Sequence, residues 1–172
     1  MSGADAWDRI WAPHRKEYLE REAGGFTAET CPFCLALDSG TEPSLVVTRA
    51  PHAYVVLNKY PYASGHLLVC TNRHVALYEE LTSAEVADVA TLTQQAMRVL
   101  RSVSKCQGFN VGMNQGSVAG AGVAGHLHQH IVPRWAGDSN FMPIVASTRV
   151  MPQLLEDTRY MLSDAWGDYD HI

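Results

Sequence analysis

The sequence predicts an α+β domain built on a mainly antiparallel β-sheet. Short apolar, β-branched runs are joined by brief turns, one long segment has helical periodicity, and strands and helices do not alternate regularly. The chain has 172 residues, of which 47% are hydrophobic and 18% charged, which suffices for one globular core. We therefore expect a single domain at residues 31–172, with about five strands, one long helix and a C-terminal helix.

The first 30 residues are expected to form a helical extension that packs on this domain. Apolar residues recur at helical spacing from Trp7 to Glu22, although Pro13 requires a break or a new start within that run. The pair Gly24-Gly25 ends the helix. A turn at Cys31–Cys34 and a polar loop then lead into the sheet.

The expected strands are short apolar runs bounded by turn residues. They span Leu45–Thr48, Ala53–Asn58, His66–Cys70, Phe109–Asn114 and His126–Val132, with Phe141–Val150 as a further candidate. The segment Ser83–Ser104 is the long helix, because Thr82 and Glu85 match a capping box and apolar residues follow at helical spacing. Pro152 begins the closing helix.

Three histidines at two-residue spacing, His126, His128 and His130, dominate the candidate chemistry. Side chains on a strand alternate between faces, so this spacing places all three imidazoles on one face, ~7 Å apart. Three titratable rings on a half-buried surface are costly to keep unpaired. The pattern therefore predicts a chemical role for these histidines.

The segment Gly120–Gly125 matches the dinucleotide-binding pattern G-x-G-x-x-G. That pattern requires a helix after it, within a β-α-β unit, whereas a histidine-rich strand is expected here. We therefore reject dinucleotide binding. The glycines can still present backbone N–H groups to a phosphate, and a flexible hairpin loop is the alternative of equal weight.

The pair Cys31-x-x-Cys34 indicates metal or redox chemistry before a structural disulfide, because the N-terminal segment lacks the features of a secretory signal. A thioredoxin-like redox site would need a β-α-β context, which this sequence does not offer. Zinc would need about four nitrogen or sulfur ligands. Two unligated buried thiols are the alternative, and the cytoplasm is the expected compartment.

The formal net charge of −5 argues against binding to nucleic acid or to an anionic membrane, since both attract basic surfaces. No apolar run approaches the length that spans a bilayer. A small anionic substrate, held locally by histidines and backbone amides, is compatible with this charge.

Two signatures occur in order along the chain. The first runs from Asn58 through Tyr60-Pro61-Tyr62 to Gly65-His66-Leu67-Leu68-Val69, and the second comprises Asn114-Gln115-Gly116, the glycine-rich loop, the three histidines and Pro133-Arg134. Together they resemble the histidine-triad (HIT) family of nucleotide hydrolases and transferases over residues 45–133. The segments Trp11-x-Pro13-x-Arg15-x-x-Tyr18, 58–69 and 133–141 further resemble its diadenosine tetraphosphate phosphorylase branch.

The resemblance implies a catalytic set of His126, His128 and His130. His128 would attack the α-phosphorus of a nucleotide and give a covalent nucleotidyl-histidine, which water or phosphate resolves. The backbone carbonyl of His126 would fix the tautomer of His128, and His130 would donate to the leaving oxygen. The implied nucleotide-binding residues are Asn58, His66, Asn114, Gly120, Ala121 and Gly122, with Trp135 as a candidate for stacking on the nucleobase.

Resemblance to zinc-bearing members of the family implies a structural zinc site formed by Cys31, Cys34, His74 and His126. That site would tie the N-terminal turn to the sheet. The resemblance also implies a homodimer whose sheets join across the interface, with the long helix involved.

The leading hypothesis is an enzyme that hydrolyses or phosphorolyses diadenosine polyphosphates or related adenine nucleotides. The loop before His126 is one residue longer than in commoner family members, Gly122 replaces a frequent Gln or Ser, and Gln129 replaces an apolar residue, so the preferred substrate is left open. One alternative is a zinc-dependent hydrolase that uses the three histidines as metal ligands. Another is a nucleotide-binding module without turnover.

Overall fold

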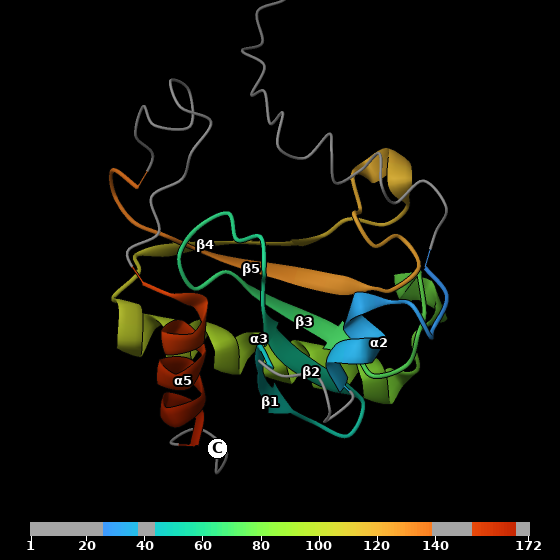
Figure 1. The fold of residues 1–172 in the computed structure, drawn as a ribbon, viewed down its shortest axis with the longest axis horizontal. Helices are drawn as coiled ribbons and strands as arrows, with labels where there is room; N and C mark the ends of the chain where they lie inside the picture. Colours follow the sequence, from blue (N-terminus) through green and yellow to red (C-terminus); the bar gives the residue numbers. More distant parts are fainter. Residues whose placement is uncertain (1–25, 38–43, 139–152, 168–172) are drawn as a thin grey trace, which may run out of the picture.

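The computed structural model describes residues 26–37, 44–138 and 153–167. Its centre is a five-stranded antiparallel sheet with the strand order β1-β2-β3-β5-β4 (Figure 1). The strands are β1 (Val46–Arg49), β2 (Ala53–Leu57), β3 (Leu67–Thr71), β4 (Gly108–Met113) and β5 (His128–Arg134). The helices are α2 (Pro32–Leu37), α3 (Ser83–Ser104) and α5 (Leu155–Trp166), with short 3-10 turns η1 (Tyr78–Glu80) and η2 (Ser117–Ala119). The α+β prediction is confirmed.

Two expectations fall outside the described residues: the helix over residues 7–22 and the further strand over 141–150. Pro152 is also outside. The closing helix is present as α5, but its predicted start at Pro152 is wrong, because Leu154 is extended and the helix begins at Leu155. The division into an extension at 1–30 and a domain at 31–172 stays a prediction. Among the residues described, no helix is both long and apolar enough to cross a membrane.

Helix α3 has the predicted bounds at both ends. Thr82 accepts a hydrogen bond from the Glu85 backbone N–H, and the Glu85 carboxylate accepts one from the Thr82 N–H, so the capping box satisfies two otherwise unpaired donors. The helix ends at Lys105, which has the left-handed conformation with φ of 53°. Its apolar stripe, which includes Val89, Ala96 and Val99, is buried against the sheet.

The two faces of the sheet carry different helices because side chains alternate along each strand. Val55, Val69 and Ile131 point into the larger core, which α3 and α5 cover. Tyr54 and Leu68 point to the opposite face, where partly buried side chains of α2 pack on them. Figure 1 shows α2 and α3 on opposite sides of the sheet.

The strand that carries the histidines begins later than expected. β5 starts at His128 and continues through Pro133 and Arg134, so His126 precedes it. The backbone N–H of His126 donates to the Val123 carbonyl across a turn instead of pairing with a neighbouring strand. The expectation that all three imidazoles line one strand is therefore wrong for His126, which is free to face a different set of partners.

Candidate functional site

His128 and His130 share the α2 face of β5. His128 pairs with Cys70 of β3, and His130 pairs with Leu68 of the same strand. Gln129 and Ile131, the odd-numbered neighbours, face α3 instead. Their ring centroids are 5.1 Å apart. The sheet thus places two adjacent imidazoles side by side, as the two-residue spacing predicts.

The tautomer of His128 follows from one contact. Its Nδ1 lies 2.8 Å from the backbone oxygen of His126, and because a carbonyl only accepts, Nδ1 carries the hydrogen. The lone pair of the neutral ring is therefore on Nε2. Burial lowers the pKa of His128, against a smaller opposite effect of this hydrogen bond, so the imidazole is neutral near pH 7. A neutral imidazole of fixed tautomer is suited to nucleophilic attack through Nε2.

A chain of two hydrogen bonds, from Tyr62 to His66 and from His66 to His130, fixes the tautomer of His130; we call this chain the relay. The backbone N–H of Tyr62 donates to Nδ1 of His66 at 3.0 Å, so a neutral His66 carries its hydrogen on Nε2. That Nε2 lies 3.0 Å from Nδ1 of His130, which must accept. His130 then carries its own hydrogen on Nε2, from which it can donate a hydrogen bond to a leaving oxygen.

His66, the middle residue of the relay, is also in contact with Asn58. His66 is fully buried, and the Asn58 side-chain amide lies 3.2 Å from its Nδ1. The Asn58 carboxamide oxygen accepts from the Tyr60 backbone N–H at 2.9 Å, which orients the amide. The ring of Tyr62 stacks on His130 with an interplanar angle of 18°. The structure therefore brings His66 into contact with His130, and Asn58 into contact with His66.

Cys31, Cys34, His74 and His126 form one cluster that could hold a metal ion, with one ligand atom from each within 4.8 Å of the others. Nδ1 of His126 lies 3.4 Å from each of the two sulfurs, and Nδ1 of His74 lies 3.3 Å from that of Cys34. Cys31 ends the turn before α2 and Cys34 lies in its first turn. The four residues predicted from the sequence as metal ligands therefore lie together in the structure.

His126 is oriented for metal binding by a backbone contact. Its Nε2 lies 2.8 Å from the carbonyl oxygen of Thr71, so Nε2 carries the hydrogen and Nδ1 presents a lone pair to the two sulfurs. Burial lowers the pKa of His126 to about 4, which keeps the ring unprotonated at neutral pH. Burial, followed by the neighbouring Cys31, raises the pKa of Cys34 to about 11.

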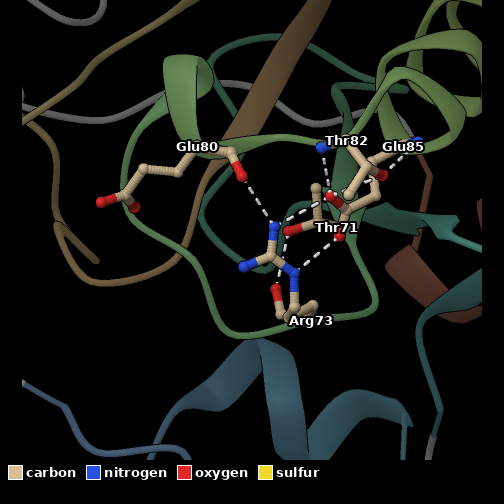
Figure 2. Close-up of polar contacts among 5 residues, drawn as sticks. All are labelled: Thr71, Arg73, Glu80, Thr82 and Glu85. Carbon is tan, nitrogen blue, oxygen red and sulfur yellow. Dashed lines mark hydrogen bonds and ion pairs between the residues drawn. The ribbon is translucent and has the colours of Figure 1, made fainter.

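The loop that carries His74 is held by an ion pair with helix α3. Figure 2 shows the Arg73 guanidinium directed at the Glu85 carboxylate and at the Glu80 carbonyl. Its Nε and Nη2 each lie 2.9 Å from a Glu85 oxygen, and Nη2 lies 2.9 Å from Glu80 O. The Thr71 hydroxyl donates to Arg73 O at 2.9 Å. The capping box of α3 is thus also the anchor of the loop at 71–75.

Gly125 brings the glycine-rich loop close to the cluster. A Cβ at this position would lie 3.3 Å from Nε2 of His74 and 3.5 Å from the Phe26 carbonyl oxygen. A side chain here would therefore push on the His74 ring. The sequence signal for this constraint is only a glycine before the first histidine, which a flexible loop would also contain.

The rest of the glycine-rich loop forms η2 and a turn, followed by strand β5, so the rejection of a dinucleotide-binding helix is confirmed. The backbone N–H of Gly120 donates to Ser117 O at 2.9 Å, and that of Ala121 lies 3.4 Å from Gly116 O. Gly122 follows in the same turn region, and Asn114 is the first residue after strand β4. The Gln115 side-chain oxygen accepts from the Tyr78 backbone N–H at 2.7 Å, which ties this loop to η1.

Trp135 lies apart from the histidines. It packs against the core on the α3 side, and its Nε1 donates to the Ser104 carbonyl at 3.0 Å. Gln129 also faces α3, where its amide donates to the Thr93 hydroxyl at 2.6 Å. The structure therefore brings neither residue to the face that carries His128.

For three residues of the site, the sequence does not indicate the contacts that the structure shows. Phe33 packs on the rings of His126 and His128, Thr71 orients His126 through a backbone oxygen, and Tyr62 stacks on His130. A backbone carbonyl or an aromatic ring beside a motif has no periodicity or spacing that marks it. These partners become visible only when the strands are paired.

The matching family model is the HIT domain, which covers residues 39–137. The chain belongs to the HIT family. It is 44% identical over 168 residues to an AP-4-A phosphorylase of Mycobacterium tuberculosis, covering 95% of this chain and 86% of that protein. It is 32% identical over 104 residues to the asymmetrical bis(5'-nucleosyl)-tetraphosphatase of Schizosaccharomyces pombe, covering 60% and 57% of the two chains.

Among solved structures, the fold is similar to a zinc-bound histidine triad family protein from Mycobacterium smegmatis. The TM-score is 0.67 at 26% sequence identity, and the alignment covers 84% of this chain and 99% of that one. These likenesses confirm the HIT-like fold that the two signatures predict.

Proposed function

We propose that this HIT protein is a nucleotidyl hydrolase or transferase that acts on diadenosine polyphosphates through a nucleotidyl-His128 intermediate. The observation that carries the proposal is the 2.8 Å contact from His128 Nδ1 to the His126 carbonyl, which leaves the nucleophilic lone pair on Nε2. The HIT relatives described above, an AP-4-A phosphorylase and a tetraphosphatase, support this class of substrate.

In the first step, the Nε2 lone pair of His128 attacks the α-phosphorus, and the bond from that phosphorus to its bridging oxygen breaks. The leaving nucleotide departs with the bonding electrons as an anion, and the Nε2 hydrogen of neutral His130 donates a hydrogen bond to its departing oxygen without transfer of the proton. The phosphorylated ring keeps its Nδ1 hydrogen, and the His126 carbonyl stabilises the resulting positive charge. Diadenosine tetraphosphate releases ATP in this step and leaves an adenylyl group on His128.

In the second step, an oxygen of the acceptor attacks the same phosphorus and the P–N bond breaks, which returns the electron pair to Nε2 of His128. A phosphate acceptor gives ADP and a water acceptor gives AMP. The 44% identity to an AP-4-A phosphorylase over 95% of this chain favours phosphate. Asn58 and His66 act here by positioning His130, and Asn114, Gly120, Ala121 and Gly122 are the proposed phosphate-binding residues. Base stacking by Trp135 is left out, because its ring packs toward α3.

We propose that the four-residue cluster binds Zn²⁺. Tetrahedral zinc with bonds of ~2.3 Å to sulfur and ~2.05 Å to nitrogen separates a sulfur from a nitrogen by about 3.6 Å. Three of the four sulfur–nitrogen distances are 3.3–3.4 Å, and the tautomer of His126 leaves the required lone pair. Zinc bound by two thiolates and two imidazoles is a closed structural site, which joins α2 to the sheet.

The metal-hydrolase alternative fits the geometry less well. Within the described residues, the cluster of potential metal ligands includes His126 but neither His128 nor His130. Nδ1 of His128 is bonded to a carbonyl, and Nδ1 of His130 to His66. The three histidines therefore face different partners instead of converging on one ion.

We further propose a cytoplasmic homodimer. All four cysteines are free thiols, which agrees with a reducing compartment. Strand β4 lies at the edge of the sheet, and the Val111 side chain on it is 45% exposed, so a second copy can extend the sheet there. Val111→Lys should shift the mass measured by light scattering from dimer to monomer. An unchanged mass would place any interface elsewhere.

The test of the function is intact-mass spectrometry after mixing protein with diadenosine tetraphosphate, with and without phosphate. Wild type should gain the mass of one adenylyl group, and His128→Ala should not. ADP that forms only with phosphate identifies a phosphorylase, whereas AMP without phosphate identifies a hydrolase. Turnover by His128→Ala at the wild-type rate would overturn the covalent mechanism. Nucleotide binding without adduct or product would indicate a binding module.

A further inference from the structure

Phe33 has no role in metal ligation or in the transfer chemistry, yet it contacts both. It lies between the cluster residues Cys31 and Cys34. Its ring centroid is 4.8 Å from that of His128, with the planes tilted by 48°, and 5.6 Å from that of His126 in an edge-on arrangement. Its backbone carbonyl accepts a 2.6 Å hydrogen bond from the hydroxyl of the fully buried Tyr54.

We propose that Phe33 is a positioning residue for His128, and that a metal ion bound by Cys31 and Cys34 fixes its ring against the imidazole. The proposal deepens the function above, because it rests on His128 as the nucleophile. The cluster then does more than join α2 to the sheet. When the metal site is occupied, the His128 ring is held in one orientation, and when the site is empty that orientation is lost.

Besides the neighbouring His130 ring, two contacts restrain the His128 ring, one from a cluster residue and one from the residue between the two cluster sulfurs. The hydrogen bond from Nδ1 ends on the carbonyl of His126, whose ring is a proposed ligand. Phe33 packs against the same ring and is flanked in sequence by the two proposed sulfur ligands. A hydrogen bond alone allows the imidazole to tilt about that bond, whereas an aromatic ring packed against it restricts this motion.

Helix α2 needs an external tether to present Phe33. It has six residues, and a helix of that length is not stable without tertiary support. Its apolar contact with the sheet comes from the partly buried side chains of Phe33, Ala36 and Leu37 on a four-residue cluster of the sheet. Ligation through both cysteines adds a covalent-strength restraint at the first turn. Metal removal is therefore expected to release Phe33 while the five-stranded sheet persists.

The first test follows the Nδ1 hydrogen of His128 by NMR in protein labelled with 15N-histidine, with the signal assigned by its loss in His128→Asn. Bound zinc is first verified at one per chain. In Phe33→Ala that retains zinc, exchange of this hydrogen with water should be at least about tenfold faster than in wild type. Phe33→Leu should give an intermediate rate and serves if Phe33→Ala does not retain metal. Chelation of zinc from wild type should reproduce the fast exchange.

The matched control is Phe109→Ala. Phe109 is a partly buried phenylalanine of β4 that packs on the core with α3, beside the Arg101 guanidinium, so its removal should leave the His128 signal unchanged. Equal exchange rates in wild type and both Phe33 variants would overturn the proposal. An effect of the same size in Phe109→Ala would overturn it too, because the change would then reflect loss of general stability.

The second test is the rate of adenylyl transfer to His128 in a single turnover. It should fall by about tenfold to about a hundredfold in Phe33→Ala, since displacing a reacting group by ~1 Å costs up to ~10²-fold, while KM changes less than about twofold. A raised KM with an unchanged His128 signal would make Phe33 a substrate contact and overturn the proposal. If wild type forms no adduct at all, the proposed function fails, and the exchange measurement still decides whether Phe33 orders His128.

Discussion

Replacing Glu85 tests how strongly α3 anchors the loop that carries His74. The pKa of Glu85 is about 2, below its ordinary value of 4.5. The largest cause is the hydrogen bond from the Arg73 guanidinium, and hydrogen bonds from Thr82 lower the pKa further. Desolvation by burial acts in the opposite direction and raises it. The difference between the two pKa values sets a ceiling of about 3.4 kcal/mol on the stabilisation at pH 7. The Arg73 side chain is 50% exposed, so solvent screens the pair and we expect about 2 kcal/mol.

Two variants separate the ion pair from the capping box. Glu85→Gln keeps an oxygen for the Thr82 N–H but loses the charge and one of the two acceptors for Arg73, so it should lower the free energy of unfolding by about 2 kcal/mol. Glu85→Ala loses the cap as well and should cost about 1 kcal/mol more. Glu79→Gln, an exposed glutamate in η1, is the matched control and should stay within about 0.5 kcal/mol of wild type.

The assay is urea unfolding followed by circular dichroism at 25 °C, with chelator present throughout so that loss of metal in acid does not contribute. A carboxyl whose folded-state pKa is lowered stabilises the fold fully above its unfolded pKa, and loses that effect as the pH falls through the folded value. The difference between wild type and Glu85→Gln should therefore shrink between pH 4.5 and pH 2, to less than half by pH 3. A difference that is absent at pH 7, or that does not shrink in acid, would refute the reasoning.

Three further predictions concern the histidines and the loop. His66→Leu removes the donor to Nδ1 of His130, so the His130 hydrogen is no longer held on Nε2 and kcat for diadenosine tetraphosphate should fall at least about tenfold; an unchanged kcat would argue against the relay. Because burial lowers the pKa of His128, the acid limb of kcat/KM should have its midpoint below pH 6.5, and a midpoint at or above that value would contradict it. Gly125→Ala should weaken zinc binding about tenfold in competition with a chelating dye, since its Cβ would press on His74. Gly112→Ala, where a Cβ meets nothing within 4 Å, should bind zinc as wild type does.

Elements with local determinants could be predicted closely from the sequence. Helix α3 has its expected bounds because its cap, its apolar spacing and its end are all encoded within 24 residues of chain, from Thr82 to Lys105. The hairpin of β1 and β2 and the strands β3 and β4 differ from expectation by one residue at their ends. The two signatures also predicted the HIT-like fold, because they combine residues of several strands in a fixed order.

Contacts between distant segments could not be predicted in the same way. His126 leaves the strand because Thr71, 55 residues away, accepts its Nε2 hydrogen, and because the sulfurs of Cys31 and Cys34 gather at its Nδ1. His66 is fully buried, and its Nε2 lies 3.0 Å from Nδ1 of His130, a contact between two different segments of the chain; its role at the nucleotide stays a prediction. In each case the polar group follows a partner supplied by strand pairing, which spacing along the chain does not encode.

The two faces of strand β5 have different roles, and this restricts where residues can be inserted into or deleted from the chain. Even-numbered positions face α2 and carry the chemistry, while Gln129 and Ile131 face α3 and complete the core. Inserting or deleting one residue between His128 and Ile131 would exchange these faces and lose both at once. The loop between β4 and β5 has no such constraint, because lengthening a loop costs only about (3/2)RT ln n in closure entropy. Insertions are therefore expected to be tolerated in the loop before His126 and excluded within the strand that begins at His128.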